Sequence, residues 1–258
     1  MVTDCHAHLD DARMTDFVKS YRSLDGEKSD FVVFSNSVDE YSSVRNLSMS
    51  LSDPHLVAFV GIHPQILNQD IKAEKEEYWE PKLKRIENLL QEASGLGEIG
   101  LDPKYGGTDM QEYLFARQLE LVETRNISVT IHSRDSLDRC LEIISTFSLN
   151  RSRLLFHWFA GDLPELKRIQ GMGYYVSFGL PILYSKRVQS LLKAADHSLV
   201  LAETDSPLPL SSVWNGFVAS PFAISSVIFG MGRILGKTFA QVNEQNDENA
   251  RKYLATQN

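Results

Sequence analysis

The stretch Val2-Thr3-Asp4-Cys5-His6-Ala7-His8 is a short run of β-branched and apolar residues that ends in two histidines. On a β-strand the side chains of residues i and i+2 point to the same face, so both imidazoles are able to reach one metal ion. A single histidine at a strand end is more often a hydrogen-bonded side chain than a ligand. The paired spacing of His6 and His8 favours a metal site, whereas strand alternation turns Cys5 to the opposite face as a buried thiol.

The composition is that of a globular protein. The chain has 258 residues, 43% of them hydrophobic, and no linker or low-complexity tract divides it, so we expect one domain over residues 1–258. A formal net charge of −8 opposes tight non-specific binding to nucleic acid, although two divalent ions would make a cleft locally positive. The two cysteines, Cys5 and Cys140, have no zinc-ribbon spacing, which disfavours structural zinc and a disulfide scaffold.

The N-terminal residues lack a basic region followed by an apolar run, and the longest apolar runs are far shorter than a membrane span. We therefore expect a soluble cytoplasmic protein with no membrane partner. No pattern in the sequence indicates an obligate protein partner.

Eight short apolar runs alternate with amphipathic segments along the chain. The runs cover residues 2–8, 31–35, 56–61, 95–100, 127–132, 154–156, 173–178 and 199–203, and helices are expected over 109–124, 163–171 and 185–195. Strand and helix in this alternation predict an α/β fold, a single (β/α)8 barrel. A doubly wound open sheet remains possible, but its dinucleotide-binding version is disfavoured because no GxGxxG follows the first strand.

Residues that bear chemistry follow the predicted strands. In a barrel the active site gathers at the carboxyl ends of the strands. Five of the seven histidines fall there, together with two acids; these residues are His6, His8, His63, Glu98, His132, His157 and Asp205. Mixed imidazole and carboxylate ligands suit transition ions better than magnesium or calcium.

Simpler explanations exist for several of these residues. Glu98 alone could serve in a salt bridge, and Asp205 could cap the turn before Pro207. Arg134, two residues after His132, could bind a phosphate or carboxylate of the substrate, or pair structurally with Asp135. A metal site is nevertheless favoured, because all of the candidate ligands fall at or just after the ends of predicted strands.

These motifs resemble the TatD family of metal-dependent deoxyribonucleases, within the wider group of amidohydrolase-like barrels. Individually the matching stretches are weak to moderate, but their order and spacing are highly specific for the family. They are Asp4-Cys5-His6-Ala7-His8-Leu9-Asp10, Gly61-Ile62-His63-Pro64, Gly97-Glu98-Ile99-Gly100-Leu101-Asp102, Ile131-His132-Ser133-Arg134-Asp135, His157-Trp158-Phe159-Ala160-Gly161 and Glu203-Thr204-Asp205-Ser206-Pro207.

The resemblance implies two divalent ions, Zn, Mn or Mg, that activate water for cleavage of a phosphodiester. One ion would be held by His6, His8, Glu98 and Asp205, and the second by Glu98, His132 and His157, with Glu98 bridging. Asp205 would orient or deprotonate the water, and His63 and Arg134 would contact the substrate. The implied substrates are DNA ends, cleaved from 3′ to 5′, or a small phosphodiester.

The chain departs from the family pattern at positions that concern the substrate. Gln65 replaces a second histidine after the Gly-x-His-Pro motif, Trp158 replaces a cysteine, and the late Arg-Asn-Glu-Pro element is missing. Two alternatives therefore stay open: an amidohydrolase or lactonase that acts on a small molecule, and a metal-binding protein that has lost catalysis. Glu98, at the strand-four position, favours phosphodiesters over the first alternative, because many amidohydrolase barrels bridge their metals with a carboxylated lysine.

Overall fold

The structure, a computed structural model, describes residues 1–23, 31–69, 75–149, 153–209 and 217–254. These residues form two compact units. The first comprises Met1–Ser35, Asp53–Leu56 and His157–Tyr253. The second comprises Asn36–Ser52 and Val57–Phe156, and Leu254 also belongs to it. The expectation of a single domain over residues 1–258 stays a prediction.

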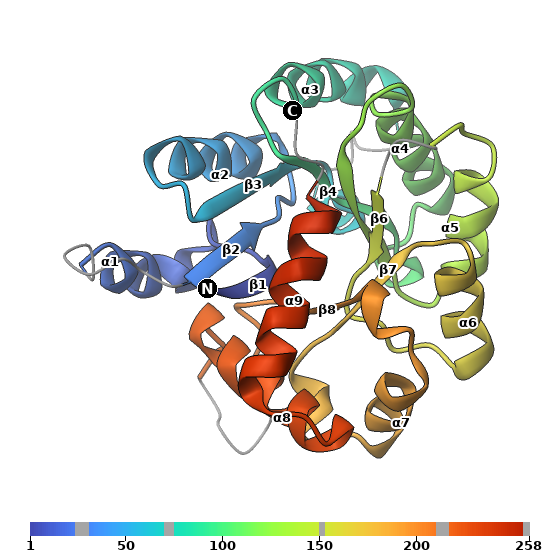
Figure 1. Cartoon of the computed structure of the whole chain (residues 1–258). Coiled ribbons are helices and arrows are strands. Elements are labelled where there is room, and N and C mark those ends of the chain that lie inside the picture. Colours follow the sequence, from blue (N-terminus) through green and yellow to red (C-terminus); the bar gives the residue numbers. More distant parts are fainter. Residues whose placement is uncertain (24–30, 70–74, 150–152, 210–216, 255–258) are drawn as a thin grey trace. The chain divides into compact units, whose positions relative to one another are not determined.

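The first unit contains two pairs of parallel strands (Figure 1). β1 (Val2–Ala7) pairs with β2 (Phe31–Ser35), and β7 (Tyr175–Phe178) pairs with β8 (Val200–Ala202). A parallel bridge joins Ala7 to Ser206, so the chain leaving β8 lies beside the end of β1. The helices of this unit are α1 (Thr15–Ser23), α6 (Leu163–Gly171), α7 (Lys186–Ala194), α8 (Ile224–Leu235) and α9 (Phe239–Tyr253).

The second unit contains the consecutive strands β3 to β6, which pair in parallel. Their bounds are β3 (Leu56–Val60), β4 (Gly95–Leu101), β5 (Ser128–Ser133) and β6 (Arg153–Phe156), the first residue of β3 belonging to the first unit. The helices are α2 (Glu40–Ser52), α3 (Glu76–Leu89), α4 (Thr108–Glu120) and α5 (Leu137–Ile144). Short 3-10 turns such as η2 (Pro64–Gln69) and η4 (Pro103–Tyr105) follow β3 and β4.

The strand order β1 to β8 follows the chain, and the crossovers contain helices, as a (β/α)8 barrel requires. All eight predicted strands are present. Their ends differ from the predicted ones by one or two residues: β1 ends at Ala7, so His8 lies just beyond it, and β8 ends at Ala202. The strands are buried along most of their length, which is why they read as nearly continuous apolar runs.

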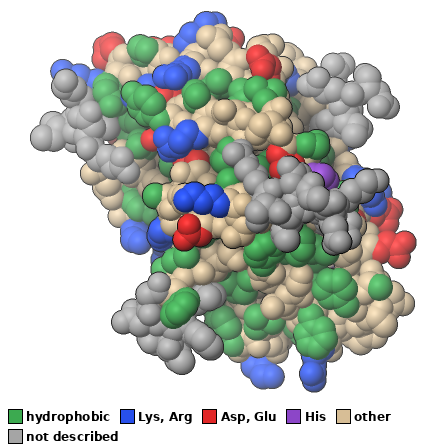
Figure 2. Space-filling view, turned by 90° about the vertical axis from the view of Figure 1, so that its left-hand side faces the viewer, with side chains coloured by type: hydrophobic (Ala, Val, Ile, Leu, Met, Phe, Trp, Pro, Cys, Tyr) green, Lys and Arg blue, Asp and Glu red, His purple; other side chains and the backbone are tan. Residues whose placement is uncertain are grey.

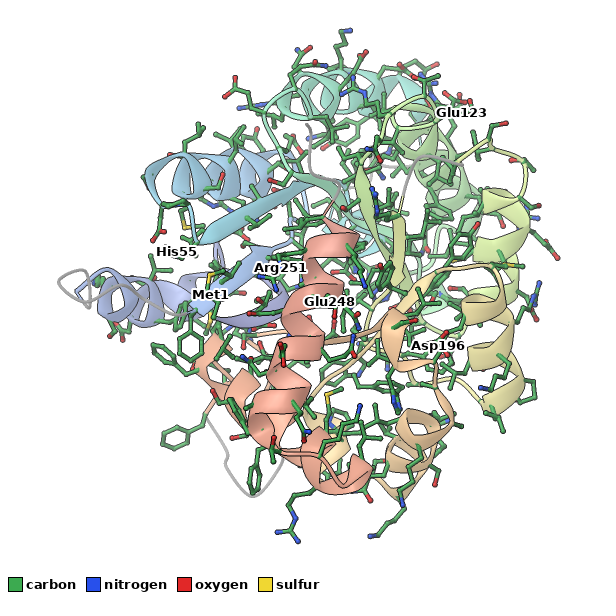
Figure 3. All side chains as sticks on the ribbon, in the orientation of Figure 1. Met1, His55, Glu123, Asp196, Glu248 and Arg251 are labelled. Carbon is green, nitrogen blue, oxygen red and sulfur yellow. The ribbon has the colours of Figure 1, made fainter. Side chains whose placement is uncertain are left out.

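Polar side chains of α9 hold the first and last strands of the first unit. Asn246 accepts a hydrogen bond from Ala202 N and donates one to Thr3 O, each at 2.8 Å. Met1, labelled in Figure 3 beside α9, has its amino group 3.6 Å from a carboxylate oxygen of Asp247. Asn249 donates to Val200 O at 2.8 Å, so its amide ties α9 to β8.

The surface carries charges of both signs. On the face drawn in Figure 2, Lys and Arg side chains are scattered among Asp and Glu side chains, and the described residues form no continuous basic band there. This distribution fits the net charge of −8. Among the described residues no single helix is long and apolar enough to cross a membrane, and Pro221–Leu235 with Phe239–Tyr253 reach that length only as a pair bent by 111°.

Candidate functional site

A cluster of two imidazoles and one carboxylate lies at the carboxyl end of β1 in the first unit. We call His6, His8 and Asp205 the first cluster. The Nε2 atoms of His6 and His8 are 3.3 Å apart, and each lies 3.4 Å from Oδ1 of Asp205. His6 is fully buried, whereas His8 and Asp205 keep 17% of their side-chain surface exposed. A buried wall and an open side are what a metal site needs if substrate is to enter.

The turn after β8 places Asp205 opposite the two histidines. Asp205 has a left-handed backbone (φ 50°), its N–H donates to His6 O at 2.9 Å, and His8 N donates to Ser206 O at 2.7 Å. Asp4, buried in β1, fixes the same turn by accepting hydrogen bonds from Thr204 N at 2.9 Å and Thr204 Oγ1 at 2.5 Å. The main chain and one buried carboxyl group therefore determine where the Asp205 side chain points.

Two carboxyl groups of this region have shifted pKa values. Burial raises the pKa of Asp4 to about 8. Burial opposes ionisation of Asp205 as well, but the hydrogen bonds from His6 and His8 and the charges of His6 and His157 together outweigh it and hold the pKa of Asp205 far below its usual range. Asp205 is therefore a carboxylate at neutral pH.

His157, at the end of β6, belongs to the first unit and lies beside the first cluster. Its ring stacks on that of His6 with centroids 4.0 Å apart and planes inclined by 13°. Its Nδ1 is 3.7 Å from Oε1 of Glu203, which is fully buried. The two oxygens of Glu203 accept hydrogen bonds of 2.6 Å from Trp158 N and Ser177 Oγ. Glu203 thus holds the turn that follows His157, a role that the sequence reasoning missed.

A second cluster lies at the carboxyl ends of strands in the second unit. We call His63, Glu98 and His132 the second cluster. Oε1 of Glu98 is 3.2 Å from Nε2 of His63 and 2.6 Å from Nδ1 of His132. The two imidazoles meet edge to face, with ring centroids 4.5 Å apart. Glu98 and His63 are 2% and 4% exposed, so this carboxylate is enclosed by imidazoles rather than by water.

The backbone before Glu98 explains how β4 aims that side chain. The pairing of β4 with β5 shifts its register between Leu96 and Ile99. At Gly97 a Cβ atom would lie only 2.8 Å from both Asn36 Oδ1 and the Cβ of Thr130, so only glycine fits. Gly97 O and Glu98 N bond instead to the backbone of Ser37, each at 3.0 Å.

Asp102 adds a second carboxylate to the second cluster, and the sequence reasoning gave it no role. Its Oδ2 accepts a 2.9 Å hydrogen bond from Nε2 of His132, and its Oδ1 accepts one of 2.9 Å from Lys104 N. Burial opposes ionisation of Asp102, but the hydrogen bonds from His132 and Lys104 N and the nearby charges of His132 and Arg134 together outweigh it and lower the pKa of Asp102. The Gln111 amide bonds both backbone groups of Asp102, at 2.7 and 2.8 Å, which explains why this glutamine is buried in an otherwise amphipathic helix.

The predicted substrate residues occupy different environments. His63 lies against Glu98. Arg134 is exposed at the end of β5, and within the described residues it forms no ion pair with Asp135. Its guanidinium acts on Asp102 through charge and contributes to that carboxyl's lowered pKa. The expectations that His63 and Arg134 contact substrate stay predictions.

The donor sets of the two clusters suit divalent transition ions. In each cluster one candidate ligand atom from each residue lies within 4.8 Å of those from the other two. Imidazole nitrogen with carboxylate oxygen is the combination that Zn, Mn and Fe accept. The sequence-predicted ligands thus occupy the first cluster, the neighbouring His157, and the second cluster. Cys5 is fully buried, and burial raises the pKa of its thiol, so it is an inert core residue as expected.

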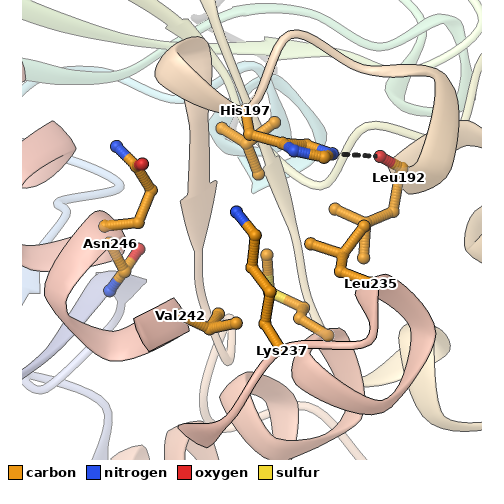
Figure 4. Close-up of a pocket in the computed structure, with 9 residues that line it drawn as sticks. Leu192, His197, Leu235, Lys237, Val242 and Asn246 are labelled. Carbon is orange, nitrogen blue, oxygen red and sulfur yellow. Dashed lines mark hydrogen bonds between the residues drawn. The ribbon is translucent and has the colours of Figure 1, made fainter. Parts of the chain in front are cut away.

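A small cavity elsewhere in the first unit is not an alternative functional site to the two clusters. It has a volume of about 20 Å³ and lies near the start of β8, between Leu192, His197, Lys237 and Val242 (Figure 4). That volume holds roughly one water molecule. Its position at the amino end of a strand, where barrels carry stability rather than catalysis, agrees with a structural role.

Comparison with known proteins identifies relatives over the whole chain. The family model described as TatD related DNase matches residues 3–255. The uncharacterized metal-dependent hydrolase YabD of Bacillus subtilis is 24% identical over 257 residues, covering 98% of both chains. Human deoxyribonuclease TATDN3 is 27% identical over 265 residues, covering 97% of this chain and 93% of the relative.

A solved structure has the same fold. The crystal structure of YjjV, a TatD homologue from Escherichia coli, superposes with a TM-score of 0.84 over 98% of this chain and 97% of that one, at 20% sequence identity. This likeness confirms the (β/α)8 barrel that the strand pattern predicted.

Proposed function

Because the chain belongs to the TatD-related DNase family, we propose that it is a metal-dependent hydrolase of phosphodiester bonds that removes nucleotides from the 3′ ends of DNA. The observation that carries the proposal is the pair of imidazole and carboxylate clusters at strand ends. Relatives named as metal-dependent hydrolases and as a deoxyribonuclease support it.

Each cluster would hold one divalent ion. His6, His8 and Asp205 supply two nitrogens and one oxygen in the first cluster, and Glu98 and His132 supply one of each in the second. When bound, the ions would activate water and stabilise the leaving oxygen of the phosphodiester. The partial exposure of His8, Asp205 and His132 leaves a side of each cluster open to substrate.

Asp205 is the group that orients the attacking water and accepts its proton. Its carboxylate is ionised because hydrogen bonds from His6 and His8 keep its pKa low, and the backbone bonds of its turn hold it in place. Asp4 fixes that turn from inside β1. Asp205 is thus ionised and held in place before any substrate binds.

Substrate recognition is local rather than spread over the surface. A protein of net charge −8 with scattered basic side chains gains little from a broad electrostatic contact with DNA. The exposed guanidinium of Arg134 provides two parallel donors for a phosphate at the end of β5. Such a site favours chain ends, where one phosphate is held closely, over long duplex tracts.

The test is a nuclease assay with the purified protein, stripped of metal and reloaded with manganese, magnesium or zinc. A 5′-labelled single-stranded oligonucleotide should be shortened in single-nucleotide steps, and a 3′-labelled one should release labelled mononucleotide at once. The matched control is Asp205→Asn, which keeps the size of the side chain and should lose nearly all turnover.

Three outcomes would overturn the proposal. Failure to cleave both DNA and a model phosphodiester with all three metals would exclude a phosphodiesterase. Preferential turnover of a lactone or cyclic amide would identify a small-molecule amidohydrolase. Stoichiometric metal binding with no turnover of any of these substrates would identify a metal-binding protein without catalysis.

A further inference from the structure

His63 and His132 look equivalent from the position of Glu98. Each presents one ring nitrogen to Oε1 of that carboxylate, at 3.2 and 2.6 Å. By distance alone, both are candidate ligands for an ion in the second cluster. The difference lies at the opposite nitrogen of each ring, because the partner there decides which nitrogen carries the proton.

The far nitrogen of His63 accepts a hydrogen bond from the main chain. Gln65 N donates to Nδ1 of His63 at 3.0 Å, as the chain enters η2. A backbone N–H is only a donor, so Nδ1 must offer its lone pair and the ring proton must lie on Nε2. The Nε2–H of His63 therefore points at Glu98, and a protonated nitrogen has no lone pair for a metal ion.

The ring of His63 is fixed in this orientation. His63 is 4% exposed, and its own N–H donates to Val38 O at 3.0 Å. Tyr105 packs against its edge with ring centroids 6.0 Å apart and planes inclined by 75°. Turning the ring over would put Cδ2–H in the place of Nδ1 and leave Gln65 N without this acceptor.

The far nitrogen of His132 has the opposite kind of partner. Oδ2 of Asp102 accepts a hydrogen bond from Nε2 of His132 at 2.9 Å. A carboxylate only accepts, so Nε2 carries a proton. Nδ1 faces the carboxylate of Glu98 at 2.6 Å, and it can release its own proton and bind an ion because Asp102 keeps the other ring proton on Nε2. Asp102 is itself held by Lys104 N and by the amide of Gln111, so it keeps His132 in this state.

We propose that His63 is a positioning residue and not a metal ligand: its Nε2–H is a permanent donor that holds the Glu98 carboxylate, while His132 is the histidine of the second cluster that supplies imidazole nitrogen to the ion. The assignment rests on the proposed metal site of the second cluster. The main-chain N–H of Gln65 and the carboxylate of Asp102 make two similar histidines behave differently. The substrate contact expected for His63 from the sequence stays a separate prediction.

The first measurement compares metal content and affinity of the full-length protein with Zn²⁺ as the probe. His132→Ala should lose one ion per chain relative to the unmodified protein. His63→Ala should keep the full number of ions, with affinity reduced by no more than about tenfold, the lower end of what a lost hydrogen-bond partner of a ligand costs. His63→Gln, whose amide also donates, should restore the affinity. Loss of an ion in His63→Ala would overturn the assignment.

The second measurement reads the tautomer directly and does not depend on metal binding or on activity. Nitrogen-15 spectra of the imidazoles should show His63 with its proton on Nε2 both without metal and with Zn²⁺ bound. A proton on Nδ1, or a metal-bound nitrogen signal from His63, would overturn the proposal even if every variant folds poorly. If the protein binds no ion at all, the proposed function fails, and the metal-free spectrum still decides the orientation of His63.

Discussion

The first and second clusters use the same side chains but obtain their geometry in different ways. In the first cluster two ligand nitrogens come from one strand, at His6 and His8, and the spacing of a β-strand brings them together. In the second cluster, His63 follows β3 and His132 lies near the end of β5, and each is oriented by a partner outside the cluster. One cluster is a local chelate, and the other is a product of tertiary packing.

The largest effect should come from removing one ligand from each cluster. His8→Ala and His132→Ala should each lower bound metal from about two ions to about one, and each should reduce turnover by at least about 100-fold, since losing even a hydrogen-bond partner of a ligand costs about 10–100-fold. Elemental analysis and kcat on the same samples measure both. His197→Ala is the control, because His197 bonds Leu192 O away from both clusters. Unchanged metal content in His8→Ala would show that His6 and His8 do not bind a metal ion together.

Asp102→Asn should affect the second cluster alone. The oxygen of the new amide is needed by Lys104 N, so its NH2 would face Nε2 of His132 and force the ring proton onto Nδ1. Metal affinity at one of two sites should fall by about 10–100-fold. A chelator competition titration measures the metal affinity of each cluster. An equal loss of affinity at both clusters would contradict the prediction that Asp102 acts on the second cluster alone.

Asp4→Ala should disturb the first cluster through the turn that carries Asp205. The change leaves the N–H of Thr204 without its buried acceptor and leaves the hydroxyl with Ser206 Oγ as its remaining side-chain partner, at a cost of about 2–3 kcal/mol, or roughly 5–10 °C in Tm. Thr204→Ser keeps the hydroxyl and should retain most of the stability. Thermal unfolding with and without Zn²⁺ measures the effect, and a Tm within 1–2 °C of the unmodified protein, roughly the scatter of an exposed substitution, would show that the turn does not depend on Asp4.

Asp196→Asn, at the amino end of η6 (His197–Leu199), should give the smallest effect. Hydrogen bonds from Ser198 lower the pKa of Asp196, so its stabilising contribution is present at neutral pH and is lost as the pH falls through that lowered pKa. The Tm of the variant should be roughly 1–3 °C lower at pH 7, and the difference from the unmodified protein should shrink as the pH falls through the lowered pKa of Asp196. A difference that stays constant as the solution is acidified would mean that the ionised carboxylate is not responsible.

Much of the fold and most of the candidate ligands could be predicted from the sequence because they depend on local pattern. Short apolar runs identify buried parallel strands, and residues that follow such runs gather at one end of a barrel. Glu203 and Asp102 were missed as functional residues because their importance lies in what they bond. Gln111 reads as one more polar residue of α4, yet it is 2% exposed and holds the backbone of Asp102.

By itself, the sequence determined the order of the strands and the pairing of His6 with His8, because a side-chain period of two is a property of any β-strand. The folded structure decided how each imidazole is used. The residue types around His63 and His132 do not tell which ring nitrogen carries a proton. That choice follows from the backbone conformation after His63, which brings the N–H of Gln65 to Nδ1, and from a tertiary contact, which brings the carboxylate of Asp102 to His132.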